Sequence, residues 1–319
     1  MVRLRTLVLN FSVGLIASGS IVAFSQDYPT RPIRIVTSAA GGGNDFMARL
    51  MAQWLTGPLG QQVIVENRTS LLAYEVVAKA QPDGYSISYF GSSFATLPVL
   101  QEAPYHPVRD FSPISLTESA PVVVVVHPSV PIKSIKELIA LAKAKPGAIN
   151  YGSGTTGGAQ HLPVEYFKSM TGVNLVRVAY KGSGPAHNAL LGGEIQLMFT
   201  TIPSVMPHIK SGKLTALAVS SLKRSALAPD LPTVAESGVP GYEFIGPGGI
   251  VAPAKTSAAI INRLNREIVR VLSTPEAKEK FLSVGAEATS STPAELGAFV
   301  KNEMARLAKL IKETGITEK

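Results

Sequence analysis

The sequence predicts an α/β protein with two lobes, each built on a largely parallel sheet that helices cover on both faces. Short runs of β-branched residues alternate with segments of helical periodicity over most of the 319 residues. This order is typical of βαβ units. The end of the chain differs, because helical segments follow one another there without strands between them. Such helices need a sheet formed earlier in the chain to pack against.

Strands are expected in apolar runs at residues 33–37, 63–66, 85–89, 122–127, 174–178, 195–199, 214–220 and 249–252. The run 122–126 is all valine, which is typical of a strand buried on both faces. Helices are expected between these runs at residues 45–55, 71–80, 135–144, 161–170, 185–191 and 204–210.

Beyond Ser257 we expect helices at residues 258–272, 275–284 and 293–314. Thr274 and Thr292 are each followed by proline and a nearby acid, which is the pattern of a capped helix start. Because these helices must return to the first sheet, we expect a discontinuous lobe of residues 26–122 plus 247–319 and a second lobe of residues 123–246. A ligand cleft would lie between them.

Composition excludes several classes of protein. With 45% hydrophobic and 16% charged residues the chain is not disordered. The absence of cysteine excludes a disulfide scaffold, a thiolate metal site and a cysteine nucleophile. The length favours two domains.

Residues 1–25 have the pattern of a secretory signal peptide. Arg3 and Arg5 precede a short apolar stretch, and Ala23 and Ser25 are small residues at the expected cleavage site. We therefore expect export to the periplasm with cleavage after Ser25. A membrane anchor is the alternative interpretation, and the Ser- and Gly-diluted apolar stretch disfavours it.

Two glycine-rich loops each connect a strand to a helix. The first, SAAGGGND, contains three consecutive glycines, and Asn44 or Asp45 could cap the helix that follows. The second, NYGSGTTGG, contains Gly152-x-Gly154-x-x-Gly157, the pattern of a dinucleotide site. No acid follows at the end of the next strand, so this pattern favours a small carboxylate at least as well. An exported enzyme that binds NADP through this loop and Lys181 is the alternative.

A third loop, YKGSGPA, also lies between a strand and a helix. Ligands of open α/β sheets bind outside the carboxyl ends of strands, where all three loops lie. Catalytic patterns are absent: Ser153 and Ser183 lack a nucleophile elbow, and His161 with Glu165 favours an ion pair over a metal site. We expect no enzyme activity, no metal and no cofactor.

Several segments occur together in a familiar order: YPTRPIRIVTSAAGGGNDFMARLMAQWL, VENR, VAKAQPDGYSI, YHPVRDFSPI, AKPGAINYGSGTTGGAQHL, VAYKGSGPAHNALLGGEIQLMF and PHIKSGKLTALAV. The chain resembles the Bug family, the extracytoplasmic solute receptors of tripartite tricarboxylate transporters. The resemblance implies a two-lobed periplasmic-binding-protein fold of the type II-like "Venus flytrap" kind. It also implies a small carboxylate ligand, delivery to a membrane permease and a monomer.

The resemblance places ligand-binding residues on loops from both lobes. They are Ala39, Ala40, Gly41, Gly42, Gly43, Asn44, Asp45, Ser92, Ser93, Ser153, Gly154, Thr155, Thr156, Gly157, Gly158, His161, Tyr180, Lys181, Gly182 and Thr200.

Three departures from the family pattern bear on the ligand. The loop at residues 69–72 is shorter and lacks glycine, and Thr200 stands where an Asp is common. Residues 246–249 replace a stretch that often carries Trp or Tyr, which would admit a bulkier ligand, for example an aromatic one. A receptor that signals through a sensor protein remains a further alternative.

The basic charge does not indicate nucleic acid. The formal charge is +8, and the leader carries two arginines and no acid, so the exported chain would carry +6. Its lysines are spread along helices without interleaved aromatic residues, which is typical of solvated surfaces.

Overall fold

The computed structural model describes residues 28–154 and 156–316 of the chain. The expected leader and Thr155 lie outside the described residues. The predicted α/β fold is confirmed: strands and helices alternate up to Val219, and helices dominate the chain after Pro253.

Strands of the described part form one mixed sheet in the order β2-β1-β3-β9-β4-β7-β5-β6, and β10 and β8 also pair with β4. Their bounds are β1 Ile33–Thr37, β2 Val63–Asn67, β3 Ser86–Phe90, β4 Phe111–Val126, β5 Asn150–Ser153, β6 Val176–Ala179, β7 Leu197–Thr201, β8 Thr215–Val219, β9 Ile245–Pro253 and β10 Glu287–Ala288. Helices are α1 Gly43–Leu59, α2 Ser70–Ala78, α3 Ser93–Leu100, α4 Ile135–Ala144, α5 Leu162–Thr171, α6 Ser183–Leu191, α7 Ile202–Lys210, α8 Ala258–Leu272, α9 Pro275–Ser283 and α10 Pro293–Thr314.

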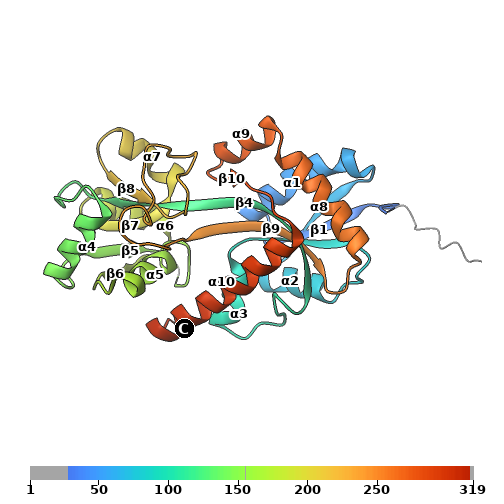
Figure 1. The fold of residues 1–319 in the computed structure, drawn as a ribbon, viewed down its shortest axis with the longest axis horizontal. Helices are drawn as coiled ribbons and strands as arrows, with labels where there is room; N and C mark the ends of the chain where they lie inside the picture. The colour runs from blue at the N-terminus through green and yellow to red at the C-terminus, as the bar shows by residue number, and fades with distance from the viewer. Residues whose placement is uncertain (1–27, 155, 317–319) are drawn as a thin grey trace, which may run out of the picture.

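The long strand β4 joins two lobes, because its hydrogen-bonding partners change along its length. Up to Pro121 it pairs antiparallel with β9, and from Val122 to Val126 it pairs with β7 and β8. We call lobe 1 the part built on β1–β3, β9, β10 and residues 111–121, and lobe 2 the part built on β5–β8 and residues 122–126. Figure 1 shows β4 and β9 running between the lobes.

Among the described strands, parallel pairing joins β1 with β2 and β3 in lobe 1 and β5 with β6 and β7 in lobe 2. The valines of residues 122–126 are buried, as expected of a central strand. The sequence indicated only this second half of β4. Its first half alternates serine, threonine and proline with apolar residues, and that composition conceals a strand. The helix α3 and the short strand β10 were not predicted either.

The last helix, α10, packs on both lobes. Leu296 and Val300 lie in an apolar cluster of lobe 1, while Leu307, Leu310 and Ile316, which follows the helix, lie in the main cluster of lobe 2. Figure 1 shows α10 crossing from one lobe to the other. With 22 residues the helix is about 33 Å long, which is enough to span both.

Both predicted caps near the C-terminus are confirmed. The Thr274 hydroxyl accepts from the Ala277 N–H, and Thr292 forms a reciprocal capping box with Glu295. Among the described helices, none combines the length and apolar character that crossing a bilayer requires.

Candidate functional site

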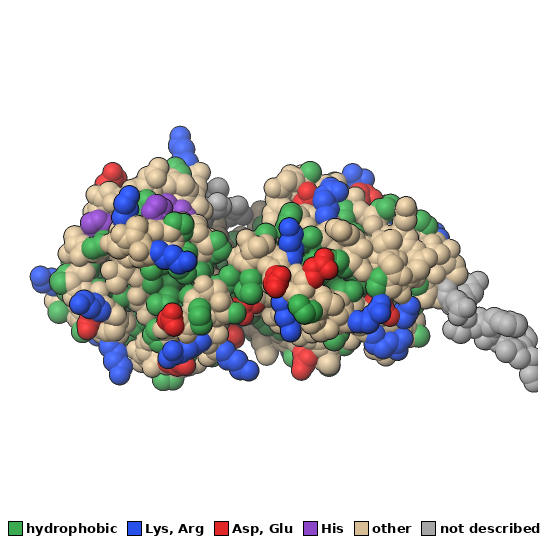
Figure 2. Space-filling view, turned by 90° about the horizontal axis from the view of Figure 1, so that it is seen from above, with side chains coloured by type: hydrophobic (Ala, Val, Ile, Leu, Met, Phe, Trp, Pro, Cys, Tyr) green, Lys and Arg blue, Asp and Glu red, His purple; other side chains and the backbone are tan. Residues whose placement is uncertain are grey.

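A cavity of about 600 Å³ lies between the lobes, where Figure 2 shows the molecule narrowing. The start of α1, the β3–α3 turn and the first half of β4 line it from lobe 1. The loop before α5 lines it from lobe 2. Residues 244–247 and one side of α10 form the rest of its wall. Most of the lining is apolar, including Phe90, Phe94, Leu100, Phe244 and Phe299.

The first glycine loop brings the start of α1 to this cavity. Gly43 and Asn44 line it, and Gly42 is the N-cap of α1, not Asn44 or Asp45 as the sequence suggested. Asp45 is buried and accepts hydrogen bonds from the Gly41 N–H at 2.9 Å and Asn67 at 2.8 Å.

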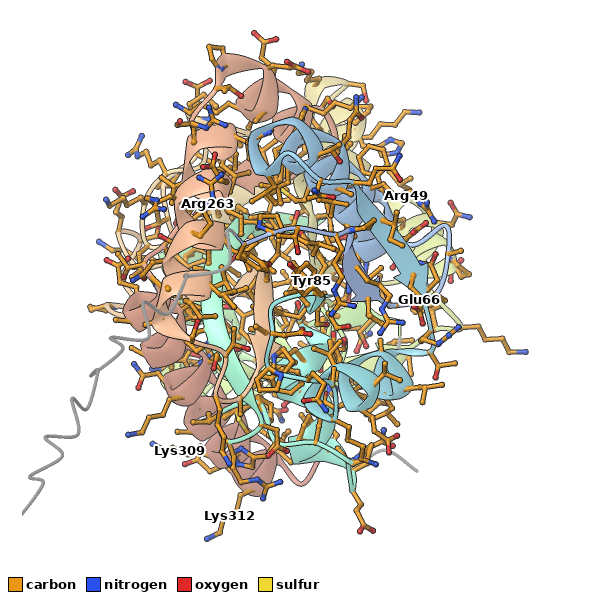
Figure 3. The ribbon with its side chains drawn as sticks, turned by 90° about the vertical axis from the view of Figure 1, so that its right-hand side faces the viewer. Arg49, Glu66, Tyr85, Arg263, Lys309 and Lys312 are labelled. Carbon is orange, nitrogen blue, oxygen red and sulfur yellow. The ribbon has the colours of Figure 1, made fainter. Side chains whose placement is uncertain are left out.

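Burial opposes ionisation of Asp45, but these hydrogen bonds outweigh it and hold the pKa of the carboxyl below its usual value. Arg49, labelled in Figure 3, completes the arrangement with an ion pair at 2.9 Å. The Asp45 carboxylate therefore fixes the shape of the loop from behind.

The start of α3 lies directly beside the first loop. The Asn44 side chain packs on Gly91, where a Cβ would come within 2.5 Å of Asn44 Oδ1, so a larger residue at this position would displace the Asn44 side chain. Ser92 and Ser93 line the cavity, and the Ser93 hydroxyl hydrogen-bonds the Tyr74 hydroxyl at 3.0 Å.

Arg177 on β6 holds the second glycine loop in place. Its guanidinium donates to Ser153 Oγ at 2.7 Å, to Thr156 Oγ1 at 3.2 Å and to the Gly154 carbonyl at 3.2 Å. The cation thus lies behind the loop and brings positive charge close to the cavity without lining it.

Two side chains of the second loop bond its own backbone. The Gly154 N–H donates to Gln160 Oε1 at 3.2 Å, and the Gly157 N–H donates to His161 Nδ1 at 3.1 Å. Burial, aided by the Arg177 charge, lowers the pKa of His161 to about 4, so its ring is neutral and accepts at physiological pH.

The dinucleotide alternative receives no support from this geometry. Gly152 lies within β5, packed against Ile195, and the N–H groups of Gly154 and Gly157 already have acceptors. Lys181 is exposed and, within the described part of the chain, lies outside the cavity lining.

Backbone N–H groups at the starts of three helices remain for a ligand. Within residues 28–154 and 156–316, no acceptor bonds the N–H groups of these cavity-lining residues: Gly43 and Asn44 at α1, Ser92 and Ser93 at α3, and Ala159 before α5. Such groups, together with the helix dipole, favour an anion.

Of the predicted ligand-binding residues, those that line the cavity are Gly43, Asn44, Ser92, Ser93, Thr156, Gly157 and Gly158. Ala39, Ala40, Gly41 and Gly42 lie in the exposed part of the first loop, and Asp45, Ser153, Gly154 and His161 lie buried beneath the loops. Tyr180, Lys181 and Gly182 lie beside the second loop, with Gly182 against Gly154. Thr155 is not described.

Thr200 is buried in lobe 2. Its hydroxyl accepts from Gln160 Nε2 at 3.1 Å and lies 2.8 Å from His187 Nε2. It therefore supports the second loop through Gln160.

The other two sequence departures also differ from expectation in their effect. No residue of 69–72 is among the described residues that line the cavity, and α2 already begins at Ser70. The space above Gly248 and Gly249 is not open: Glu118 and Tyr89 fill the first, and Phe90 fills the second. Only Gly246 and Pro247 of that stretch face the cavity.

Sequence reasoning missed Glu118, Arg177 and the side of α10 that includes Phe299. Glu118 gave no clear signal, because the serine, threonine and proline of residues 111–121 conceal the strand that carries it. Arg177 gave no signal, since its role depends on the pairing of β5 with β6.

Residues 47–316 match the family described as "Tripartite tricarboxylate transporter family receptor". The chain belongs to this family. Protein BugT of Bordetella pertussis is 36% identical over 309 residues, which cover 94% of this chain and 95% of BugT. Bug and related family members are periplasmic solute-binding receptors, not enzymes.

Two solved receptors show the same fold with a ligand. R. palustris Rpa4515 with adipate is 33% identical with a TM-score of 0.71, and the match covers 91% of this chain and 99% of that one. MatC from Rhodopseudomonas palustris with bound malate is 26% identical with a TM-score of 0.67, over 89% of this chain and 100% of that one.

A metal site at His161 and Glu165 receives no support in this receptor. The two side chains lie 3.9 Å apart, and Glu165 already bonds Lys168 and the Tyr151 hydroxyl. No group of three possible metal ligands occurs among the described residues.

Proposed function

We propose that this protein captures a small carboxylate between its lobes and delivers it to the membrane permease of a tripartite tricarboxylate transporter. In this proposal the chain passes between the lobes near residues 122 and 247, and residues 1–25 are removed as a signal peptide.

The observation that carries the proposal is the convergence of helix starts on one cavity. The N–H groups of Gly43 and Asn44, of Ser92 and Ser93, and of Ala159 have no acceptor among the described residues, and they come from both lobes. A carboxylate can accept several such bonds at once, and hydrogen bonds to a charged acceptor contribute about 1.5–3 kcal/mol each. No lysine or arginine is needed in the lining.

The apolar wall favours a ligand with a hydrocarbon body. Phe90, Phe94 and Leu97 line the cavity from lobe 1, and Phe244 and Ile245 line it near the lobe junction. Adipate and malate, found on Rpa4515 and MatC, combine carboxylates with a short carbon chain. Closing the lobes would remove such a chain from water, and each buried methylene contributes about 0.8 kcal/mol.

Calorimetry with the chain from residue 26 onward tests the proposal. The panel contains mono- and dicarboxylates of increasing length, including adipate and malate, together with ω-amino carboxylates. At least one member should bind with a clear heat, raise the melting temperature and remain chemically unchanged. Failure of every carboxylate to bind would refute the proposed function.

Two variants show whether binding occurs in this cavity. Gly43 faces the cavity with open space where a Cβ would lie, so Gly43→Leu should abolish binding without disturbing the fold. Gln53→Leu adds a leucine to an exposed position of the same helix and should bind like the wild type.

A further inference from the structure

The cavity contains one acidic group that a receptor for simple carboxylates does not need. Glu118 on β4 lines it together with Ala120 and Val122, which lie on the same face of the strand. The pairing of β4 with β9 shifts register between Leu116 and Glu118. Such a bulge changes the direction of the next side chain.

Hydrogen bonds fix the Glu118 carboxyl in this position. The Tyr89 hydroxyl donates to Glu118 Oε1 at 3.1 Å and accepts from Thr117 Oγ1 at 3.0 Å. Gly248 leaves the necessary room, because a Cβ there would lie 2.6 Å from the Tyr89 hydroxyl and would also contact Glu118. A bulge, a buried tyrosine and a glycine therefore hold one carboxyl at the cavity wall.

Glu118 has no cationic partner in the part of the chain that the structure describes. The other acid of the lining, Glu303, is neutralised by Arg306, whose guanidinium bonds both of its oxygens. No lysine, arginine or histidine is among the described lining residues. Burial raises the pKa of Glu118 to about 7, against the opposing effect of the Tyr89 hydrogen bond. An unpaired carboxylate in such surroundings is costly unless the ligand supplies the partner.

We infer that the preferred ligand is a carboxylate that also carries a cationic nitrogen, and that Glu118 pairs with this nitrogen. This inference rests on the proposed function and adds that the ligand carries a positive charge besides its carboxylate.

The spacing along β9 supports this arrangement. Gly246 approaches Ser92 Oγ, and Gly248, two residues further on the same face, approaches Glu118. Two strand residues span about 7 Å. The start of α3 and Glu118 thus lie beside β9 residues that are about 7 Å apart, which is within the reach of a short alkyl chain between a carboxylate and a nitrogen.

Matched sets of ligands that differ in one terminal group test the inference. We would measure binding by calorimetry for hexanoate, adipate and ε-aminocaproate, and for butyrate, succinate and γ-aminobutyrate. In at least one set the amino member should bind most tightly, because it alone brings a cation to Glu118. The dicarboxylate should bind less tightly than the amino member because its second carboxylate faces an acid.

Glu118→Gln should weaken the amino ligand about tenfold or more and should not weaken the monocarboxylate, because it removes an acid that only a cation would pair with. Glu236→Gln is the matched control, because it removes the same charge from an exposed position of lobe 2 and should change neither ligand.

The outcomes separate the two proposals. If monocarboxylates or dicarboxylates bind but the amino members show no advantage, or if Glu118→Gln leaves their affinity unchanged, the inference about the nitrogen is wrong and the receptor function stands. Tighter binding of the dicarboxylate at low pH would also contradict it, because Glu118 would then act as a neutral donor. If no member binds, the proposed function itself fails.

Discussion

Alanine at Gly157 should interfere with the approach of the two lobes across the cavity. Gly157 belongs to the second loop of lobe 2, and a Cβ there would lie 2.5 Å from Leu100 Cδ1 on α3 of lobe 1. Its φ of +71° adds a cost of about 1–2 kcal/mol for any residue with a side chain. The steric contact adds a cost of about 1–3 kcal/mol where the lobes pack tightly, as they would around a ligand.

Gly147→Ala provides the matched control. Gly147 is also in lobe 2 and has a φ of +79°, but its nearest neighbours would lie at 3.8 Å and 3.9 Å, which is ordinary contact. Both variants should lose a similar free energy of unfolding from backbone strain. Only Gly157→Ala should lose ligand affinity, by about 5- to 150-fold.

Calorimetry with the tightest-binding carboxylate and denaturant unfolding measure the two effects separately. Leu100→Ala in the Gly157→Ala background should restore part of the affinity, and the double-mutant cycle gives the coupling between the lobes. Equal ligand affinities of Gly157→Ala and Gly147→Ala would refute the reasoning.

Three further predictions concern the supports of the site. Arg177→Gln should weaken ligand binding about tenfold, because it removes the support of the second loop, and should raise the pKa of His161, because it removes the cation beside that ring. Calorimetry measures the affinity and an NMR titration measures the pKa. An unchanged His161 pKa would contradict this prediction. Folding raises the pKa of Glu118 to about 7, so between about pH 4.5 and 7 the folded state holds a proton that the unfolded state has lost. The free energy of unfolding should therefore fall as pH rises through that window. Denaturant unfolding should show a smaller fall for Glu118→Gln. Leu307→Ala should lower the free energy of unfolding by about 2–5 kcal/mol, since this side chain of α10 is buried against lobe 2, and a loss below 1 kcal/mol would refute that packing role.

The alternating order of apolar runs and helical segments was enough to predict the fold class, and the Thr-Pro signals located the starts of α9 and α10. It was not enough for β4, whose first half contains Pro113, Ser115 and Thr117. Pro113 and Ser115 lie opposite Val251 and Ile250 of β9, and this distant pairing forms the first half of β4. The local sequence does not show which distant strands will pair with a segment.

The predicted site shows the same limit. Glycine loops before helices located Gly43, Asn44, Thr156, Gly157 and Gly158, because an anion site at a helix start depends on local chain geometry. Glu118 and Arg177 could not be assigned roles in advance. Both act through strand pairing: Glu118 reaches the cavity through a bulge opposite β9, and Arg177 reaches the second loop because β6 lies beside β5.

The course of α10 has a consequence for attempts to divide the protein. Because Leu307, Leu310 and Ile316 complete the core of lobe 2, a fragment of residues 123–246 would expose the apolar surface that they cover. A fragment of lobe 1 would in turn carry a helix end with no partner. The two lobes should therefore unfold together in one transition, and a probe attached after Ile316 would report on lobe 2 although α10 begins on lobe 1.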